Sequence, residues 1–206
     1  MAADPARPTR TAQLHDDGKH RCAWCENDPL MVAYHDEEWG RPLRDERRLF
    51  EMLCLEGAQA GLSWRTVLHK RPAYRLAFDQ FDAMKIASYT IAKKEQLLTN
   101  AGIVRNRLKV NAFIGNAQAY LKLLESGITL NDYLWQFTDH KILCNRRLTL
   151  GDYPASTEVS DAMAKDMRKR GFRFVGTTIC YALMQSVGIV DDHQKGCWVG
   201  AVLDSA

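Results

Sequence analysis

The sequence has no long apolar run. No stretch of about eighteen consecutive apolar residues, roughly the length that spans a bilayer, occurs in the chain. The amino-terminal segment MAADPARPTR also lacks the apolar core of a signal peptide. These absences argue against membrane insertion and against secretion, so we expect a cytoplasmic protein. Internal repeats and low-complexity segments are missing too, which argues against a repeat architecture.

A strong charge of either sign is missing as well. The chain carries 28 Lys and Arg residues against 25 Asp and Glu residues, a formal net charge of +3. This slight excess permits a nucleic-acid partner without requiring one. With 206 residues and 46% hydrophobic content, the chain can bury one sizeable core. We expect one domain over residues 20–206, preceded by a flexible extension over residues 1–19 that contains Pro5 and Pro8.

The alternation of apolar and polar residues that marks a half-buried strand is absent, whereas helical spacing recurs along the chain. This spacing predicts an all-α fold with helices over residues 45–60, 93–100, 105–124, 130–137, 156–170 and 176–187. Shorter helices are expected to start at Ser63, Pro72 and Asp82. The turn at Gly102 joins two helices into a pair of the kind that can grip phosphates. The segment 146–154 is the best candidate for a longer loop.

The six cysteines have to be interpreted by their spacing. In a reducing compartment, cysteines serve as metal ligands, redox groups or buried apolar residues. Cys54 and Cys180 lie in apolar helical runs, where we expect each thiol to pack as a small hydrophobe.

Four residues near the two ends of the chain form a candidate zinc set: Cys22, His35, His193 and Cys197. The spacing of His193 and Cys197 is that of a zinc half-site, and two thiolates with two imidazoles give the tetrahedral set that Zn²⁺ favours. A closed set of four protein ligands leaves no position for an activated water. Such a site would be structural and would join the two ends of the chain. The plainer alternative is a set of surface histidines and buried thiols.

Cys25 leaves two further alternatives open. Cys22 and Cys25 make a CxxC pair that could be redox-active. Cys25 or His20 could also replace one of the four zinc ligands. We favour the set of two cysteines and two histidines over both.

Glu56 has an unusual position on its predicted helix. A helical wheel of residues 45–60 places Glu56 beside the buried face and Glu51 on the side that faces water. Glu56 is then either a boundary residue whose carboxylate reaches solvent or a group that points into a pocket. Four aromatic residues lie near these positions in the sequence and could be core residues or a stacking platform for a base: Trp24, Tyr34, Trp39 and Trp64.

Four ordered segments carry a resemblance to a known family. They are RCAWCENDPLMVAYHDEEWG, LFEMLCLEGAQAGLSWRTVLHKR, AGIVRNRLKVNAFIGNAQAYL and RGFRFVGTTICYALMQSVGIVDDHQKGC. Together they resemble the 3-methyladenine-DNA glycosylase I family over the stretch from Arg21 to Cys197. The resemblance implies the helix-hairpin-helix DNA glycosylase fold, with residues 97–110 as its hairpin. It also implies that the four end residues hold one structural Zn²⁺ that clamps the two terminal segments together.

The resemblance further implies a reaction and its residues. The reaction is hydrolysis of the N-glycosidic bond of 3-methyladenine in alkylated double-stranded DNA, with release of the free base and without strand cleavage. We expect a monomeric enzyme with no membrane partner. Base recognition falls on Glu56, Tyr34, Trp64, Trp24 and Trp39. The interrogation loop falls on Gln59 to Ser63, including Gln59, Gly61 and the wedge Leu62, and contacts to the DNA backbone fall on Gly102, Arg105 and Arg107. Met31 stands at a pocket position where the family has tyrosine.

Two rival functions remain on the residues alone. A zinc hydrolase would use Glu56 as a general base beside an open metal position. A zinc-clamped binding module would bind DNA and release no base. The two differ in whether the metal has an exchangeable ligand and in whether any base is released.

Overall fold

The computed structural model describes residues 9–204, which form two compact units. The terminal unit comprises residues 9–42, 141–155 and 184–204, and the helical unit comprises residues 43–140 and 156–183. Among these residues, no helix is both long and apolar enough to cross a membrane. Helices make up most of the helical unit, as predicted, whereas the terminal unit combines short helices with four two-residue strands. That residues 20–206 act as a single domain stays a prediction.

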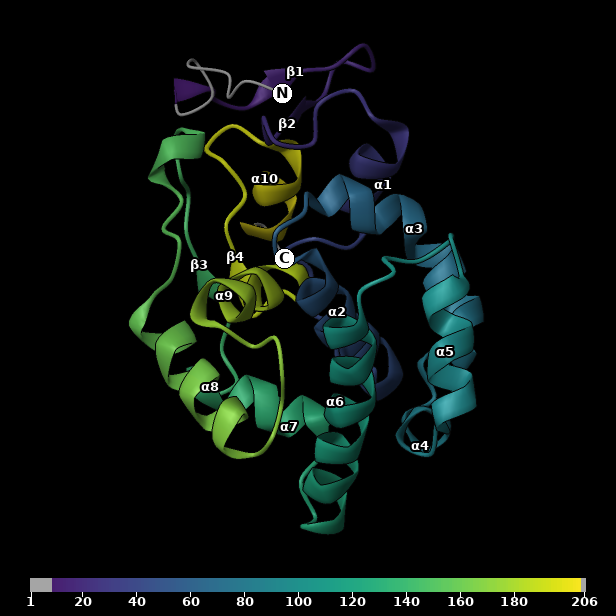
Figure 1. Ribbon diagram of the computed structural model, residues 1–206. Coiled ribbons are helices and arrows are strands. Elements are labelled where there is room, and N and C mark those ends of the chain that lie inside the picture. Colours follow the sequence, from purple (N-terminus) through teal and green to yellow (C-terminus); the bar gives the residue numbers. More distant parts are fainter. Residues whose placement is uncertain (1–8, 205–206) are drawn as a thin grey trace. The chain divides into compact units, whose positions relative to one another are not determined.

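The terminal unit joins the amino-terminal part of the chain to its carboxyl-terminal part. Strands β1 (Gln13–Leu14) and β2 (His20–Arg21) pair antiparallel, and β3 (Leu143–Cys144) and β4 (Val190–Asp191) pair parallel. The unit also contains helix α1 (Pro29–Glu37), the 3-10 turn η4 (Leu150–Asp152) and helix α10 (Trp198–Asp204), which contacts β2 (Figure 1).

Part of the expected flexible extension is structured. Strand β1 lies within it, and the carbonyl of Arg10 accepts hydrogen bonds from the Leu150 amide and from the Gln194 side chain. Residues 1–8, with Pro5 and Pro8, lie outside the described residues.

Helix α1 was not predicted from the apolar spacing, although its start has a local signal. The Asp28 side chain accepts hydrogen bonds from the Leu30 and Met31 amides, and Pro29 occupies the first helical position. Aspartate followed by proline is typical of a helix start. The carboxylate accepts hydrogen bonds from free amides of the first turn, and proline has no amide hydrogen that needs an acceptor. Met31 and Tyr34 are buried on this helix.

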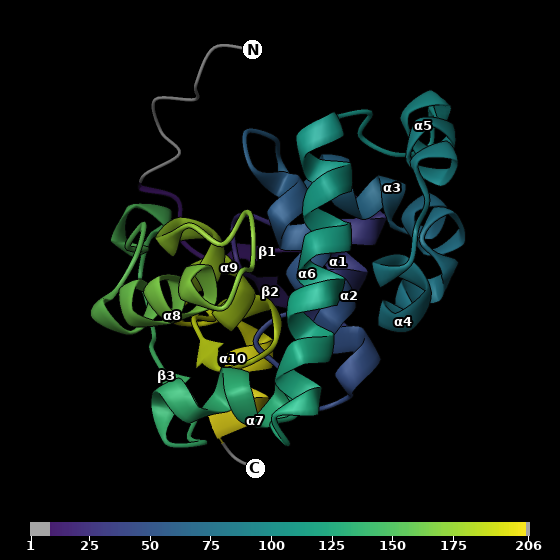
Figure 2. The ribbon, with the colours of Figure 1, turned by 60° about the horizontal axis from the view of Figure 1, so that its bottom comes forward.

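The helical unit is built around its longest helix, α6 (Arg107–Glu125). This helix contacts α2 (Glu46–Gln59), α4 (Ala83–Ala87), α5 (Ile91–Thr99) and α7 (Leu130–Trp135), as Figures 1 and 2 show. The remaining elements are α3 (Trp64–Ala77), η2 (Asp79–Phe81), η3 (Gln136–Thr138) and α8 (Glu158–Lys169). Helix α9 (Thr177–Ser186) begins in this unit. The predicted helices are therefore present, with ends that differ by a few residues.

Two expectations were wrong. Pro72 was expected to start a helix but lies inside α3, whose buried face continues on both sides of it from Leu68 to Tyr74. Packing of that face outweighs the cost of an internal proline, about 3 kcal/mol. Glu51 was expected to face water, yet it is only 5% exposed, because α3 covers that side of α2 and Arg71 Nε donates to its carboxylate at 2.5 Å.

Candidate functional site

A buried cluster of cysteine and histidine side chains lies in the terminal unit. Ligand atoms of Cys22, His35 and Cys197 all lie within 4.8 Å of one another, and among residues 9–204 they form the only such group of three. Cys197 Sγ lies 3.4 Å from His35 Nε2. Ligand atoms around a tetrahedral zinc ion lie about 3.3–3.8 Å apart, given bond lengths of roughly 2.0–2.3 Å. These three residues can hold a metal ion.

His193 lies beside this group. Its ring centroid is 5.1 Å from that of His35, and the side chain is 0% exposed. Its Nε2 atom is buried and has no hydrogen-bond partner among the described residues. A buried nitrogen without a partner is costly, and a metal ion is one kind of group that would satisfy it.

Each imidazole is oriented by a carboxylate on its other nitrogen. His35 Nδ1 lies 2.8 Å from Asp36 Oδ1, and His193 Nδ1 lies 2.6 Å from Asp191 Oδ1. Such contacts set the ring orientation and leave Nε2 as the atom available to a metal, which is the usual arrangement around metal-bound histidine. Neither carboxylate belongs to a motif that marks it in the sequence.

Arginines hold these two carboxylates in turn. Arg21 donates to Asp36 at 2.7–3.0 Å and to Asp17 of the amino-terminal hairpin at 2.7–2.8 Å. Arg146 Nη2 donates to Asp191 Oδ2 at 2.9 Å. Burial alone would raise the pKa of Asp191, but hydrogen bonds from His193 and Arg146 outweigh it and lower the pKa.

The cluster favours a thiolate on one of its cysteines. A hydrogen bond from Cys22 lowers the pKa of Cys197 against the opposing effect of burial, and His35 adds to the lowering. Burial raises the pKa of Cys22. The alternative ligands Cys25 and His20 are not members of this group of three. Burial raises the pKa of Cys25 to about 12, and its Sγ lies 3.9 Å from His15 Nε2. His20 is exposed on β2.

Two of the predicted recognition aromatics, Trp24 and Trp39, lie against the imidazoles, and a third, Tyr34, lies against Trp24. Trp24 lies edge-on to Trp39 at 4.9 Å and to Tyr34 at 6.3 Å between ring centroids. Trp39 lies 4.8 Å from the His193 ring. Tyr34 and Trp39 are buried, and Trp24 is half-buried with an indole N–H that has no hydrogen-bond partner among the described residues. The Trp24 and Trp39 rings therefore lie beside the cysteine and histidine cluster.

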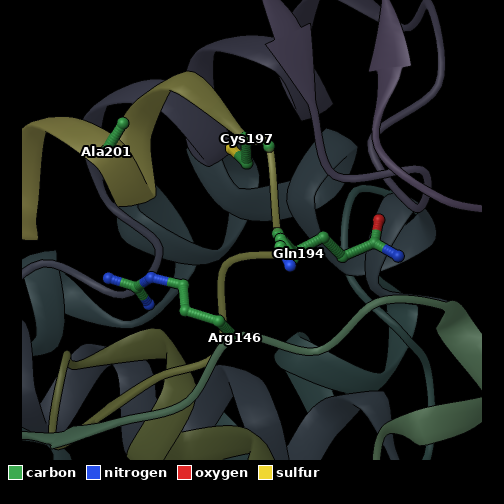
Figure 3. A pocket seen from close by; sticks show the side chains of 6 residues that line it. Arg146, Gln194, Cys197 and Ala201 are labelled. Carbon is green, nitrogen blue, oxygen red and sulfur yellow. The ribbon is translucent and has the colours of Figure 1, made fainter.

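A pocket of about 420 Å³ opens beside Cys197 in the same unit (Figure 3). It is lined by Arg146, Gln194, Lys195, Gly196, Cys197 and Ala201. None of the predicted base-recognition residues lines it. Arg146 is already committed to the Asp191 carboxylate and to the Gly200 carbonyl. The residues that line this pocket are therefore not the ones predicted to recognise the base.

In the helical unit, Glu56 lies in the last turn of α2 and is only 3% exposed. The turn that carries it packs closely on another loop of this unit, since a side chain at Gly57 would come 3.3 Å from Phe174 Cβ. After α2 the chain bends at Gly61, whose φ of +76° suits glycine. Leu62, at the bend, is 39% exposed, and Ser63 caps α3 ahead of the half-buried Trp64.

Helix α6 supplies two buried polar side chains that sequence analysis missed. Lys109 Nζ donates to the Ala58 and Ala60 carbonyls, each at 2.7 Å. Two turns further along the same face of α6, Asn116 exchanges two hydrogen bonds with the backbone of Arg173. A lysine and an asparagine seven residues apart on the apolar stripe of a helix are a signal that could have found both.

Helices α5 and α6 contact each other on either side of the turn where the hairpin is predicted. The Gly102 amide donates to Asn100 Oδ1 at 2.8 Å, and a side chain at Gly102 would come 2.8 Å from Ala73 Cβ. Arg107 makes two hydrogen bonds to Glu95, at 2.6 and 3.1 Å, and Arg105 is exposed. Gly102 therefore serves a tight turn, and its amide is already used within the hairpin.

Comparison with known proteins covers most of the chain. The methyladenine glycosylase family model matches residues 24–200. DNA-3-methyladenine glycosylase 1 of Escherichia coli (strain K12) is 52% identical over 177 residues, which is 86% of this chain and 95% of that protein. DNA-3-methyladenine glycosylase of Haemophilus influenzae is 48% identical over 177 residues, 86% of this chain and 96% of that protein.

Solved structures agree with this match. A crystal structure of 3-methyladenine DNA glycosylase I has a TM-score of 0.85 and 52% identity, covering 86% of this chain and 98% of that one. The Staphylococcus aureus enzyme, whose structure concerns the recognition of 3-methyladenine, has a TM-score of 0.84 and 33% identity, covering 87% of this chain and 96% of that one. The helical fold is thus that of these enzymes, and the chain belongs to the methyladenine glycosylase family.

Proposed function

We propose that the protein is a monofunctional DNA glycosylase that hydrolyses the N-glycosidic bond of 3-methyladenine in alkylated DNA. It releases the free base and leaves an unbroken strand with an abasic site. The observation that carries this proposal is a buried carboxylate, Glu56, within a chain whose family match spans residues 24–200. We place the activity in the cytoplasm.

The chemistry of the substrate explains why recognition suffices. In DNA, 3-methyladenine carries a positive charge that already weakens its bond to the sugar, so the enzyme need not supply a strong acid to the leaving base. Glu56 accepts hydrogen bonds from the amino edge of the flipped base. A carboxylate that is 3% exposed acts in a poorly solvated environment, where a hydrogen bond to charge is stronger than in water.

Aromatic residues complete the recognition of the cationic base. Trp64 stacks on the base with cation–π character, and Tyr34 fixes its orientation. Trp24 and Trp39 provide further aromatic surface. Met31 replaces a polar aromatic side chain with a flexible apolar one, and we expect it to change the fit of the base without changing the reaction.

The helical unit supplies the contacts to duplex DNA. Leu62 enters the gap left by the flipped nucleotide, and Gln59 and Gly61 shape its loop. Arg105 and Arg107 contact phosphates, so binding weakens as salt concentration rises. Arg107 must exchange Glu95 for a phosphate when it does so, and the role of Gly102 is the tight turn itself.

One structural Zn²⁺ fits the donor set of two thiols and two imidazoles. These donors belong to Cys22, His35, His193 and Cys197. The buried His193 Nε2 and the carboxylates behind both imidazoles support this assignment. When bound, the ion supplies a cross-link between segments far apart in the sequence. Four protein ligands leave no position for a reacting water, and this argues against the zinc hydrolase alternative.

The experiment is base release from methylated duplex DNA, with 3-methyladenine and 7-methylguanine identified by chromatography. We expect selective release of 3-methyladenine with intact strands. Glu56→Gln should lower the release rate and the affinity for free 3-methyladenine by about 10–100-fold, the value of a hydrogen bond to charge. Glu125→Gln, an exposed change at the end of α6, is the matched control.

Two results would contradict the proposal. Full excision and full base affinity in Glu56→Gln would remove Glu56 from recognition. No release by folded, zinc-loaded protein would favour the DNA-binding module.

A further inference from the structure

Lys109 is a buried lysine whose partners are backbone carbonyls. It is the third residue of α6 and only 7% exposed, and its Nζ atom donates to the Ala58 and Ala60 carbonyls at 2.7 Å each. Burial lowers its pKa. Lysine side chains are almost never buried unless a partner compensates the charge. The two carbonyls that accept hydrogen bonds from this buried ammonium therefore indicate its role.

The two carbonyls lie at the end of α2 and beyond it. Helix α2 ends at Gln59, so its last carbonyls have no amide partner within the helix. The negative end of the helix dipole also favours a cation at this place. Ala60 has already left the helix, with φ of −46° and ψ of 115°. The ammonium thus joins the last turn of α2 to the first residue of the bend.

The bend leads directly to the exposed tip of the loop. Ala60 is followed by Gly61 at φ +76° and by Leu62, whose amide donates to the Gln59 carbonyl. The Leu62 side chain is 39% exposed although it is large and apolar. Holding such a side chain outward requires a backbone that does not relax into the core, and the Lys109 hydrogen bonds restrain the backbone on the amino-terminal side of the tip.

We propose that Lys109 is a positioning residue for base excision: its hydrogen bonds to Ala58 and Ala60 hold the bend that presents Leu62 to duplex DNA. This inference rests on the proposed function. Lys109 acts through the loop and touches neither the base nor the sugar. Glu56 also lies in the last turn of α2, but in its regular helical part upstream of the bend, so we expect recognition of the free base to depend on Lys109 far less than the presentation of Leu62 does.

The experiment compares four proteins: wild type, Lys109→Met, Leu62→Ala and the double variant. Methionine keeps the length and apolar stem of lysine and removes the donors. Lys109→Met should slow 3-methyladenine release from duplex DNA by about tenfold or more and leave the affinity for free 3-methyladenine within about threefold. In the Leu62→Ala background, the same change should cost less than about threefold, because the two residues act through one feature.

Lys122→Met is the matched control, since Lys122 is an exposed lysine of the same helix. Equal losses from Lys109→Met in both backgrounds, or a matching loss of affinity for the free base, would show a general role in folding and overturn the proposal. Lys109→Arg, which keeps the charge and donors, should recover part of the rate. If Lys109→Arg recovers no rate and its circular dichroism spectrum shows an unfolded protein, that result would also count against the proposal.

Amide hydrogen exchange separates this inference from the proposed function. Lys109→Met should speed exchange at Leu62 and leave exchange in the middle of α6 unchanged. If the wild-type protein releases no base, the proposed function fails, whereas faster exchange at Leu62 would still support the restraint of the bend. Unchanged exchange at Leu62 would refute the restraint itself.

Discussion

Gly40→Ala tests whether the imidazole of His193 is held where the structure has it. Gly40 has a φ of +73°, and a Cβ atom there would come 2.7 Å from His193 Cε1 and 2.9 Å from Nδ1. Neither the Gly40 backbone nor the His193 ring can move away easily, because each is held by a hydrogen bond. The Gly40 amide donates to the Gln185 carbonyl at 2.9 Å, and Asp191 holds the buried imidazole at 2.6 Å.

Two costs add in this variant. A residue with a Cβ at this positive φ costs about 1–2 kcal/mol. Forcing a methyl group against a fixed buried ring adds about 1–3 kcal/mol, as overpacking does elsewhere. Gly18→Ala carries only the first cost, because Gly18 has a φ of +77° with nothing within 4 Å of its Cβ position. We expect Gly40→Ala to lower the free energy of unfolding by about 2–5 kcal/mol and Gly18→Ala by about 1–2 kcal/mol.

The assay is urea unfolding of both variants, with zinc content measured on the folded proteins. Gly40→Ala should bind less zinc than Gly18→Ala, because the ring carries one of the proposed ligand atoms. Equal unfolding midpoints and equal zinc contents in the two variants would refute the reasoning, since the ring would then have room that the structure denies it.

Three other changes have defined outcomes. Burial alone would raise the pKa of Asp166, but hydrogen bonds from Arg170 and Tyr133 lower it below 3.8. That stabilisation is present above the unfolded pKa and is lost as pH falls through the folded pKa. Asp166→Asn should therefore cost about 1 kcal/mol in urea unfolding at pH 7, and the cost should shrink as pH falls through the folded pKa of Asp166. Glu46→Ala should cost about 2–4 kcal/mol in the same assay at pH 7, because the Tyr120 hydroxyl and two amides at the start of α7 lose their acceptor. A chelator should lower the thermal midpoint before it lowers excision per folded molecule; lost activity at an unchanged midpoint would support the zinc hydrolase instead.

The sequence by itself determined the elements whose signals are local. Ser63 and Asp82 start helices as predicted, and Asp45 caps the helix predicted from residue 45, because a capping side chain acts within three residues of its own position. The all-α class followed from the helical spacing of apolar residues. The cysteine and histidine residues at the two ends were recognised by type, since few other functions need two thiols and two imidazoles together.

Only the tertiary structure decided which polar groups are buried and what they contact. Glu51 lies on the apparent water side of its own helix, and only the packing of α3 over that side shows that it is paired with Arg71. The carboxylates Asp36 and Asp191 gain their roles from imidazoles whose orientation depends on the folded terminal unit. Lys109 has its acceptors about fifty residues away in the chain. The spacing of apolar residues describes one helix at a time, whereas the burial of a polar group depends on the neighbours that folding brings to it.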